Sequence, residues 1–122
     1  MRAILLVSHG SHSPKTKTEV EALVDQLRRR NIADCVEYAF LEIETPSIPE
    51  GIHSLVRQGA THVQILLNFL NSGKHVDVDI PRIVKESQKE FPHVKFLISQ
   101  PVGQHSKIVD LFCELAKASH AS

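Results

Sequence analysis

The amino-acid sequence predicts a single α/β domain with a four-stranded parallel sheet and helices on both faces. Four short apolar runs are each followed by a segment with apolar residues at helical spacing. Such an alternation folds through right-handed crossovers into a parallel sheet. The chain has 122 residues, which is enough for one hydrophobic core and too few for two. We therefore expect residues 1–122 to form one domain.

The four apolar runs are the expected strands, and their composition predicts their order in the sheet. They span residues 3–8, 35–43, 62–70 and 94–99. The first and third runs are the most continuously apolar, as expected of central strands covered on both faces. Glu37 and Lys95 interrupt the second and fourth runs, which edge strands permit. These differences predict the strand order 2-1-3-4.

The helices are expected from apolar residues spaced three and four apart, which form one stripe on a helical surface. Three start signals support their placement. Ser13 precedes Pro14, Ser47 and Glu50 have the spacing of a capping box, and Asp79 is placed to cap a helix that has a proline in its first turn. The four stripes contain Val20, Leu23, Val24 and Leu27; Ile48, Ile52, Leu55 and Val56; Ile80, Ile83 and Val84; and Ile108, Phe112 and Leu115.

The charge balance and the apolar runs exclude several classes of protein. Lys plus Arg and Asp plus Glu both number 14, so no overall charge attracts nucleic acid or an acidic membrane. No apolar run reaches the length that spans a membrane, and the N-terminal run is shorter than the core of a signal peptide. We expect a cytoplasmic protein. Cys35 and Cys113 lie far apart without a CxxC motif, which predicts two reduced, buried thiols.

Three residues with metal-binding side chains are expected at one edge of the sheet. Ligands of open parallel sheets bind beyond the carboxyl ends of the strands, where the strand order reverses. Here that point lies between the first and third strands. His9 follows the first strand, His75 lies in the loop after the third, and Glu42 ends the second. Neighbouring strands are about 4.8 Å apart, so the two imidazoles can reach one metal ion.

Each of these residues also has an ordinary structural explanation. A single histidine at a strand end is more often a hydrogen-bonded loop residue than a ligand, and Glu42 is explained equally well as a surface carboxylate. It is the expected convergence of three such residues that favours a site. His12 is expected to be a solvated neighbour, His105 to lie at the far edge of the same rim, and Lys74 to be at most a contact for an anion. No function is expected for the remaining histidines, which are His53, His62, His93 and His120.

Four segments carry a resemblance to a known family. They are "LLVSHGS", "AFLEIETPSIPEGI", "FLNSGKHVDVDIP" and "QPVGQHSKIVDL". In this order and spacing they resemble the short cobaltochelatases of anaerobic cobalamin synthesis and the relatives that insert iron or nickel into sirohydrochlorin-type tetrapyrroles. The resemblance implies a chelatase that inserts a divalent metal without a nucleotide or any other cofactor. It also implies that His9 and His75 bind the metal and transfer protons, with Glu42 as a third residue by similarity to larger cobalt chelatases.

The chemistry of these residues agrees with the resemblance. Metal insertion removes two pyrrole protons, and neutral imidazole both binds divalent transition metals and titrates near neutral pH. Gly10 with Ser11, and Ser72 with Gly73, are expected to contact the macrocycle, because glycine lets backbone and ring come close. The histidine-rich insertion of some nickel-inserting relatives is absent, which argues against nickel without excluding it; cobalt is the expected metal, with iron or nickel as alternatives.

Two residues depart from the family pattern, and two other functions remain open. Asn68 stands where relatives commonly have proline, and Lys74 replaces a residue that is usually uncharged. A non-enzymatic carrier of metal or tetrapyrrole would use the same histidines, and a hydrolase would use Ser11 with His9. One rim covers only one side of a tetrapyrrole, whereas ligand sites bury most of their ligand. A homodimer that closes the other side is therefore expected.

Overall fold

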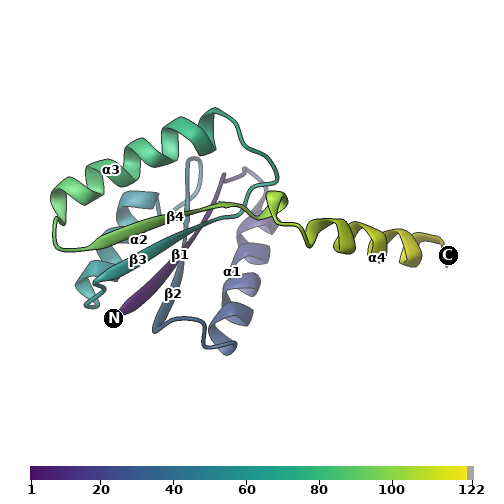
Figure 1. The fold of residues 1–122 in the computed structure, drawn as a ribbon, viewed down its shortest axis with the longest axis horizontal. Coiled ribbons are helices and arrows are strands. Elements are labelled where there is room, and N and C mark those ends of the chain that lie inside the picture. The colour runs from purple at the N-terminus through teal and green to yellow at the C-terminus, as the bar shows by residue number, and fades with distance from the viewer. Residues whose placement is uncertain (121–122) are drawn as a thin grey trace.

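A computed structural model describes residues 1–120, and it describes the side chains of residues 1–118. Its four parallel strands are β1 (Arg2–Ser8), β2 (Cys35–Phe40), β3 (His62–Leu67) and β4 (Lys95–Pro101). They lie in the order β2-β1-β3-β4, which confirms the order predicted from apolar continuity (Figure 1). The second and third strands end earlier than expected, because the chain leaves the sheet after Phe40 and after Leu67.

The helices cover the two faces of the sheet unequally. The long helices are α1 (Pro14–Arg29), α2 (Ile48–Arg57), α3 (Ile80–Glu90) and α4 (Ile108–His120). Helix α1 packs on one face and helices α2 and α3 pack on the other, whereas α4 extends away from the sheet (Figure 1). Two short helical segments complete the fold, a π-helix η1 (His75–Asp79) and a 3-10 helix η2 (Val102–Gln104). No helix within residues 1–120 is long and apolar enough to cross a membrane.

One of the predicted helix caps forms in full and another does not. Ser47 and Glu50 make the reciprocal capping box of α2, in which each side chain accepts from the other residue's backbone N–H. The hydrogen bond from the Ser47 backbone lowers the pKa of the Glu50 carboxyl. Asp79 stands at the start of α3 but makes no side-chain cap, so that prediction was wrong. The preceding π-helix already supplies a helical turn there, and the Asp79 carboxylate bonds to His75 instead.

The hydrophobic core has one large and one small part. On the α2 and α3 face, inward residues of all four strands pack against both helices, and Leu5, Val7, Ile52 and Ile65 are among the buried residues. On the α1 face, the smaller cluster consists of Ile4, Leu6, Val20, Val24, Val36 and Phe40. This second cluster draws its buried residues from β1, β2 and α1. The β4 side of the same face is left open, and Leu97 there is 69% exposed.

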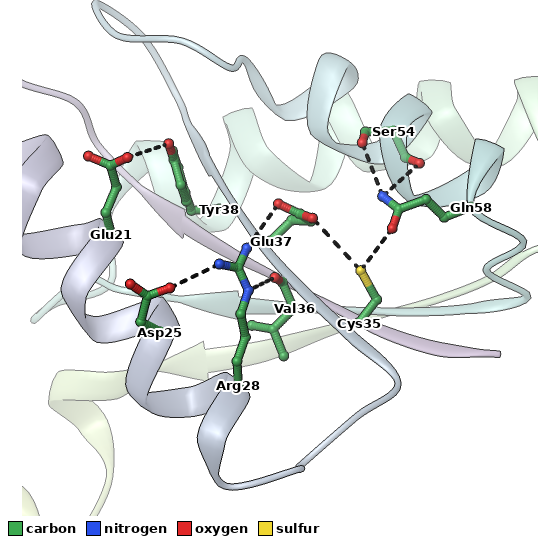
Figure 2. A network of polar contacts seen from close by, with 9 residues as sticks. All are labelled: Glu21, Asp25, Arg28, Cys35, Val36, Glu37, Tyr38, Ser54 and Gln58. Atoms are coloured by element: carbon green, nitrogen blue, oxygen red, sulfur yellow. Dashed lines mark hydrogen bonds and ion pairs between the residues drawn. The ribbon is translucent and has the colours of Figure 1, made fainter.

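A polar network closes the free edge of β2 (Figure 2). The Arg28 side chain of α1 donates from Nε to the Val36 carbonyl oxygen at 2.9 Å, and its other nitrogens contact Asp25 and Glu37. Nearby, the Tyr38 hydroxyl donates to Glu21 at 3.1 Å. An edge strand with open carbonyls invites pairing with another chain. Arg28 satisfies one of these carbonyls and surrounds it with charge.

The two cysteines are free, as expected, but neither is fully buried. Cys35 is half-buried on β2, where its thiol contacts Gln58 at 3.3 Å (Figure 2). Burial and the Glu37 carboxylate raise the pKa of this thiol, which keeps it protonated. Cys113 is exposed on α4. The expectation of a buried thiol was wrong there because α4 does not pack on the sheet.

The capping box makes a testable contribution to stability. Ser47→Ala removes the side chain that accepts from the Glu50 N–H, and it should lower the free energy of unfolding by about 1 kcal/mol. Urea denaturation followed by circular dichroism measures this change. Ser54→Ala is the control, because Ser54 lies inside the same helix, where alanine is favoured. An equal loss in both variants would contradict the role of the cap.

Candidate functional site

His9, Glu42 and His75 lie together at the carboxyl edge of the sheet. Each offers one ligand atom, and these atoms all lie within 4.8 Å of one another. The two imidazole rings have centroids 5.1 Å apart. The side chains of His9, Glu42 and His75 are 42%, 52% and 47% exposed, respectively, so the group is open to solvent. The geometry therefore allows one metal ion to be shared by two imidazoles and a carboxylate.

Backbone hydrogen bonds join the segments that carry His9 and Glu42. Leu41 N–H donates to the Ser8 carbonyl and Glu42 N–H donates to the His9 carbonyl, at 2.8 and 3.0 Å. The pairing of β1 with β2 thus continues past the ends of both strands. Glu42 was expected at the end of the second strand, and it lies instead in the loop after β2. This loop turns sharply at Ile43, whose φ of +73° is rare for a β-branched residue.

Gly10 is required by the close approach of these two segments. Its φ is +102°, which glycine adopts more readily than other residues. A Cβ atom added at this position would overlap the backbone carbonyl oxygen of Glu42. The glycine after His9 therefore sets the distance between His9 and the loop of Glu42. Gly10 therefore has a structural role in the site, in addition to any contact with a ligand.

Asn68 ties the third strand to the first beneath the site. Its side-chain amide donates to the hydroxyl of the buried Ser8 at 2.9 Å, and its backbone N–H donates to the Val7 carbonyl. A proline at this position would have no backbone N–H to donate. The sequence marked Asn68 only as a departure from a family pattern. Its pairing with a serine 60 residues away depends on the fold.

His9 faces oxygen acceptors with both ring nitrogens. Nδ1 lies 3.0 Å from the Gly10 carbonyl oxygen, and Nε2 lies 3.0 Å from Oε2 of Glu42. A neutral imidazole has a single N–H and can donate to only one of them. Nε2 of His9 and Oε2 of Glu42 are the pair of atoms that can share a metal ion.

His75 is oriented by a carboxylate on the next turn of its helix. Its Nδ1 lies 2.9 Å from Oδ2 of Asp79, which is only 15% exposed, and Arg82 lies 3.6 Å from the other oxygen of Asp79. The turn between them is a π-helix, in which Ile80 N–H donates to the His75 carbonyl. A carboxylate at Nδ1 places the ring proton there and leaves the lone pair on Nε2. The sequence signal was the spacing of four residues between His75 and Asp79, whereas Asp79 was assigned only to capping the following helix.

The other predicted site residues lie on the same rim or beside it. Ser11 N–H donates to the Glu44 carboxylate, and the Ser11 hydroxyl accepts from Ser13 N–H. Both ring nitrogens of His9 contact other groups, so a Ser11–His9 nucleophile pair is not formed. Ser72, Gly73 and Lys74 are exposed in the loop before His75, and His12 is exposed next to Ser11. His105 lines a cleft beside β4, whereas the side chain of His120 lies outside the described residues.

Exposed apolar side chains occur in the loops and short helices that follow the strands. Ile43 follows β2, Leu70 and Val78 follow β3, and Val102 follows β4. Each of these four side chains is at least half exposed. Exposed large apolar groups near a polar site are typical of a surface that binds a ligand with an apolar face. This rim thus combines candidate metal-ligating side chains with exposed apolar side chains.

Comparison with known proteins identifies the family. The CbiX family model matches residues 3–119, which is nearly the whole chain. The chain belongs to the CbiX family. The resemblance found in the four sequence segments is thereby confirmed, as is the fold. SirB from Bacillus subtilis subspecies spizizenii, a sirohydrochlorin chelatase solved in complex with cobalt, superposes with a TM-score of 0.89 at 29% identity over 96% of this chain.

Curated relatives of this CbiX chain include chelatases named for different metals. The chloroplastic sirohydrochlorin ferrochelatase of Arabidopsis thaliana is 32% identical over 88% of the chain. The sirohydrochlorin cobaltochelatase of Sulfolobus acidocaldarius is 33% identical over 96% of the chain and is matched over 91% of its own length. The chain spans about half the length of the Arabidopsis protein, at 48%, and of the SirB chain, at 50%.

The close approach at Gly10 gives a test of the site's geometry. Gly10→Ala should lower stability by more than 1 kcal/mol and weaken cobalt binding, because both the positive φ and the overlap with Glu42 oppose a side chain, and unusual φ values alone cost about 1 kcal/mol or more. Thermal unfolding and calorimetric titration with cobalt measure the two effects. Gly59→Ala is the matched control, since Gly59 has a φ of +100° with no atom within 4 Å of the added Cβ. Cobalt binding that survives in Gly10→Ala would contradict this account.

Proposed function

We propose that this CbiX-family protein inserts a divalent metal, cobalt in the first place and iron or nickel as alternatives, into sirohydrochlorin or a related tetrapyrrole without a nucleotide. The observation that supports this most directly is the group of two imidazoles and one carboxylate within 4.8 Å, open to solvent. The named activities of the relatives agree with it. Anaerobic incubation with sirohydrochlorin and each metal, followed by absorbance, tests activity and metal preference together.

The metal substrate binds to His9, Glu42 and His75 in this proposal. Imidazole and carboxylate accept cobalt, iron, nickel and zinc, so the ligands do not decide between these metals. Three protein ligands leave coordination positions open, which is what an ion to be handed on requires. Because all three side chains are about half exposed, the ion can reach the site and the ring can approach it. The negative charge of the Glu42 carboxylate partly offsets the charge of the bound ion.

Proton transfer is the second task of the same residues. A divalent ion replaces two pyrrole N–H protons, so the net charge of the ring is the same before and after insertion. As the ion moves from the protein to the ring nitrogens, the imidazole nitrogens it vacates become free to accept protons. His9 then donates to Glu42 in the contact that the structure already contains. The ligands released by the metal thus become the bases that the reaction needs.

The macrocycle contacts the rim around these ligands. The apolar side chains of Ile43, Leu70 and Val78 suit the flat face of the ring. Gly10, Ser11, Ser72 and Gly73 lie in the loops beside the two histidines and remain the proposed ring contacts. One such rim covers one side of the ring, and ligand sites usually bury most of their ligand. We therefore propose a homodimer as the working unit.

A non-enzymatic carrier of metal or tetrapyrrole remains the second candidate, because it would use the same ligands. The half-exposed position of all three ligands favours release over storage. The two functions differ in turnover. A carrier binds one equivalent and stops, whereas a chelatase releases metallated product repeatedly.

Substitution of the three ligands should reduce insertion by different amounts. His75→Ala and His9→Ala should each lower the rate by about 100-fold or more, because each removes both a ligand and a base. Glu42→Gln should slow the reaction less, since the amide oxygen can still bind the metal. Rates come from absorbance at saturating metal and ring. His53→Ala is the control, because the half-buried His53 of α2 pairs with Glu90 of α3 and lies outside the group of three ligands. Unchanged turnover in His75→Ala would refute the assignment.

Asp79 is a positioning residue in this proposal, because it acts through His75. Asp79→Asn should weaken cobalt binding by about 10- to 100-fold, as loss of a carboxylate behind a metal-binding histidine does in other sites. Nitrogen NMR of His75 should show a larger share of the Nε2–H tautomer, which a purely structural role would not produce. Asp77→Asn, in the same π-helix, controls for lost charge. An unchanged tautomer would show that Asp79 does not orient His75.

A further inference from the structure

The loop that leads to His75 is held at the end of β4 by the short helix η2. This loop spans residues 68–74, between β3 and the π-helix η1. It passes next to η2 at the carboxyl edge of the sheet (Figure 1), although Leu70 of the loop and Gln104 of η2 are 34 residues apart in the sequence. The contacts between the two segments therefore determine where this part of the rim lies.

Two hydrogen bonds join η2 to the loop. The Gly103 backbone N–H donates to the Phe69 carbonyl oxygen at 3.0 Å, and the Gln104 side-chain amide donates to the Leu70 carbonyl oxygen at 2.9 Å. Two successive carbonyl groups of the loop are thus bound by η2. The Gln104 side chain is exposed, so its removal leaves no cavity in the hydrophobic core.

Gly103 allows the two segments to approach this closely. A Cβ atom at this position would overlap the backbone of Leu70, including its carbonyl oxygen. The backbone of Gly103 is not in the left-handed region, so its own conformation permits a side chain. The loop, and not the turn itself, therefore requires glycine here.

The other hydrogen bonds of the loop lie at its two ends. Asn68 is tied to β1 through Val7 and Ser8, and the Gly73 carbonyl oxygen accepts from the Asp77 N–H at 2.7 Å. Within the part of the chain that the structure describes, η2 supplies the hydrogen bonds to the middle of the loop.

Leu70 is the apolar residue that these bonds hold in place. Its side chain is 61% exposed on the rim, and no core cluster of the described residues contains it. Its position is therefore not set by packing in the core. The bond from Gln104 to its carbonyl oxygen is what fixes it.

We propose that Gln104 is a positioning residue for the tetrapyrrole, because it holds Leu70 where the face of the ring binds. This inference rests on the function proposed above and adds to it a residue that acts on the ring and not on the metal. A loop that is ordered before the ligand arrives reduces the entropy that binding costs. His9, Glu42 and His75 are held by other contacts, so the affinity for metal does not depend on Gln104.

Binding of metal-free sirohydrochlorin tests this role. Gln104→Ala should weaken the binding by about 5- to 10-fold, because the loop loses one of its hydrogen bonds. The affinity for cobalt alone, measured by calorimetry, should stay unchanged. In turnover, the KM for the ring should rise while kcat changes little. Gln100→Ala is the matched control, since Gln100 is exposed and its side chain makes no hydrogen bond within the described residues.

A conservative variant and the loop itself provide two further measurements. Gln104→His offers a ring N–H at a similar reach, so it should regain part of the affinity for the ring at about pH 8, where the imidazole is neutral. Hydrogen exchange of the backbone amides in residues 68–74 should become faster in Gln104→Ala and not in Gln100→Ala.

A double-mutant cycle shows whether Gln104 acts through Leu70. Leu70→Ala should also weaken binding of the ring. The double variant should lose less than the product of the two single effects, because holding the loop matters less once its apolar side chain is gone. Effects that multiply in full would show that the two residues act independently, and they would overturn the proposal.

The remaining outcomes separate this proposal from the proposed function. Unchanged binding of the ring in Gln104→Ala, an equal loss of cobalt affinity, or unchanged hydrogen exchange in the loop would each refute the role of Gln104. An unmodified protein that binds sirohydrochlorin without turnover would refute the chelatase, while the binding and exchange measurements would still decide the role of Gln104. An unmodified protein that does not bind sirohydrochlorin would refute both.

Discussion

The position of β1 at the centre of the sheet determines most of the rest of the structure. Leu5 and Val7 are fully buried, and the strand pairs along its length with β2 on one side and β3 on the other. Because all strands are parallel, their carboxyl ends meet at one edge. The segments that follow β1, β2 and β3 must therefore leave the sheet side by side. His9, Glu42 and His75 come together from distant parts of the sequence for this reason.

Two carboxylates with different tasks flank the histidines. Glu42 is half exposed, and its carboxylate lies 3.0 Å from Nε2 of His9. Asp79 is largely buried, and its Oδ2 lies 2.9 Å from Nδ1 of His75. Its other carboxylate oxygen lies 3.6 Å from Arg82. Solvent exposure separates a carboxylate that can exchange partners from one that fixes a ring. The exposed Glu42 carboxylate is therefore the one suited to exchanging partners, whereas the Asp79 carboxylate is the one suited to orienting His75.

The sequence was informative where a single physical pattern decides the outcome. Continuous apolar runs require burial on both faces, so the central places of β1 and β3 followed from composition. Asp79 was misassigned because a carboxylate at a helix start can bond either to backbone N–H groups or to a side chain, and only the π-helical turn decides between them. The apolar stripe predicted helix α4 correctly, but Phe112 and Leu115 of this stripe are exposed in the structure, and a stripe does not specify which surface covers it. Asn68 and Ser8 needed the folded sheet before their pairing was visible.

The π-helical turn from His75 to Asp79 also limits how this segment can change in evolution. Such a turn contains one more residue than an α-helical turn, as the bond from Ile80 N–H to the His75 carbonyl indicates. Deleting a single residue between Val76 and Val78 would restore regular α-helix and rotate His75 by about 100° around the helix axis relative to α3. The imidazole would then lose both Asp79 and its place beside His9. A substitution that keeps His75 and Asp79 leaves this geometry in place, whereas an insertion or deletion does not, so the length of the segment should vary less among functional descendants than its composition.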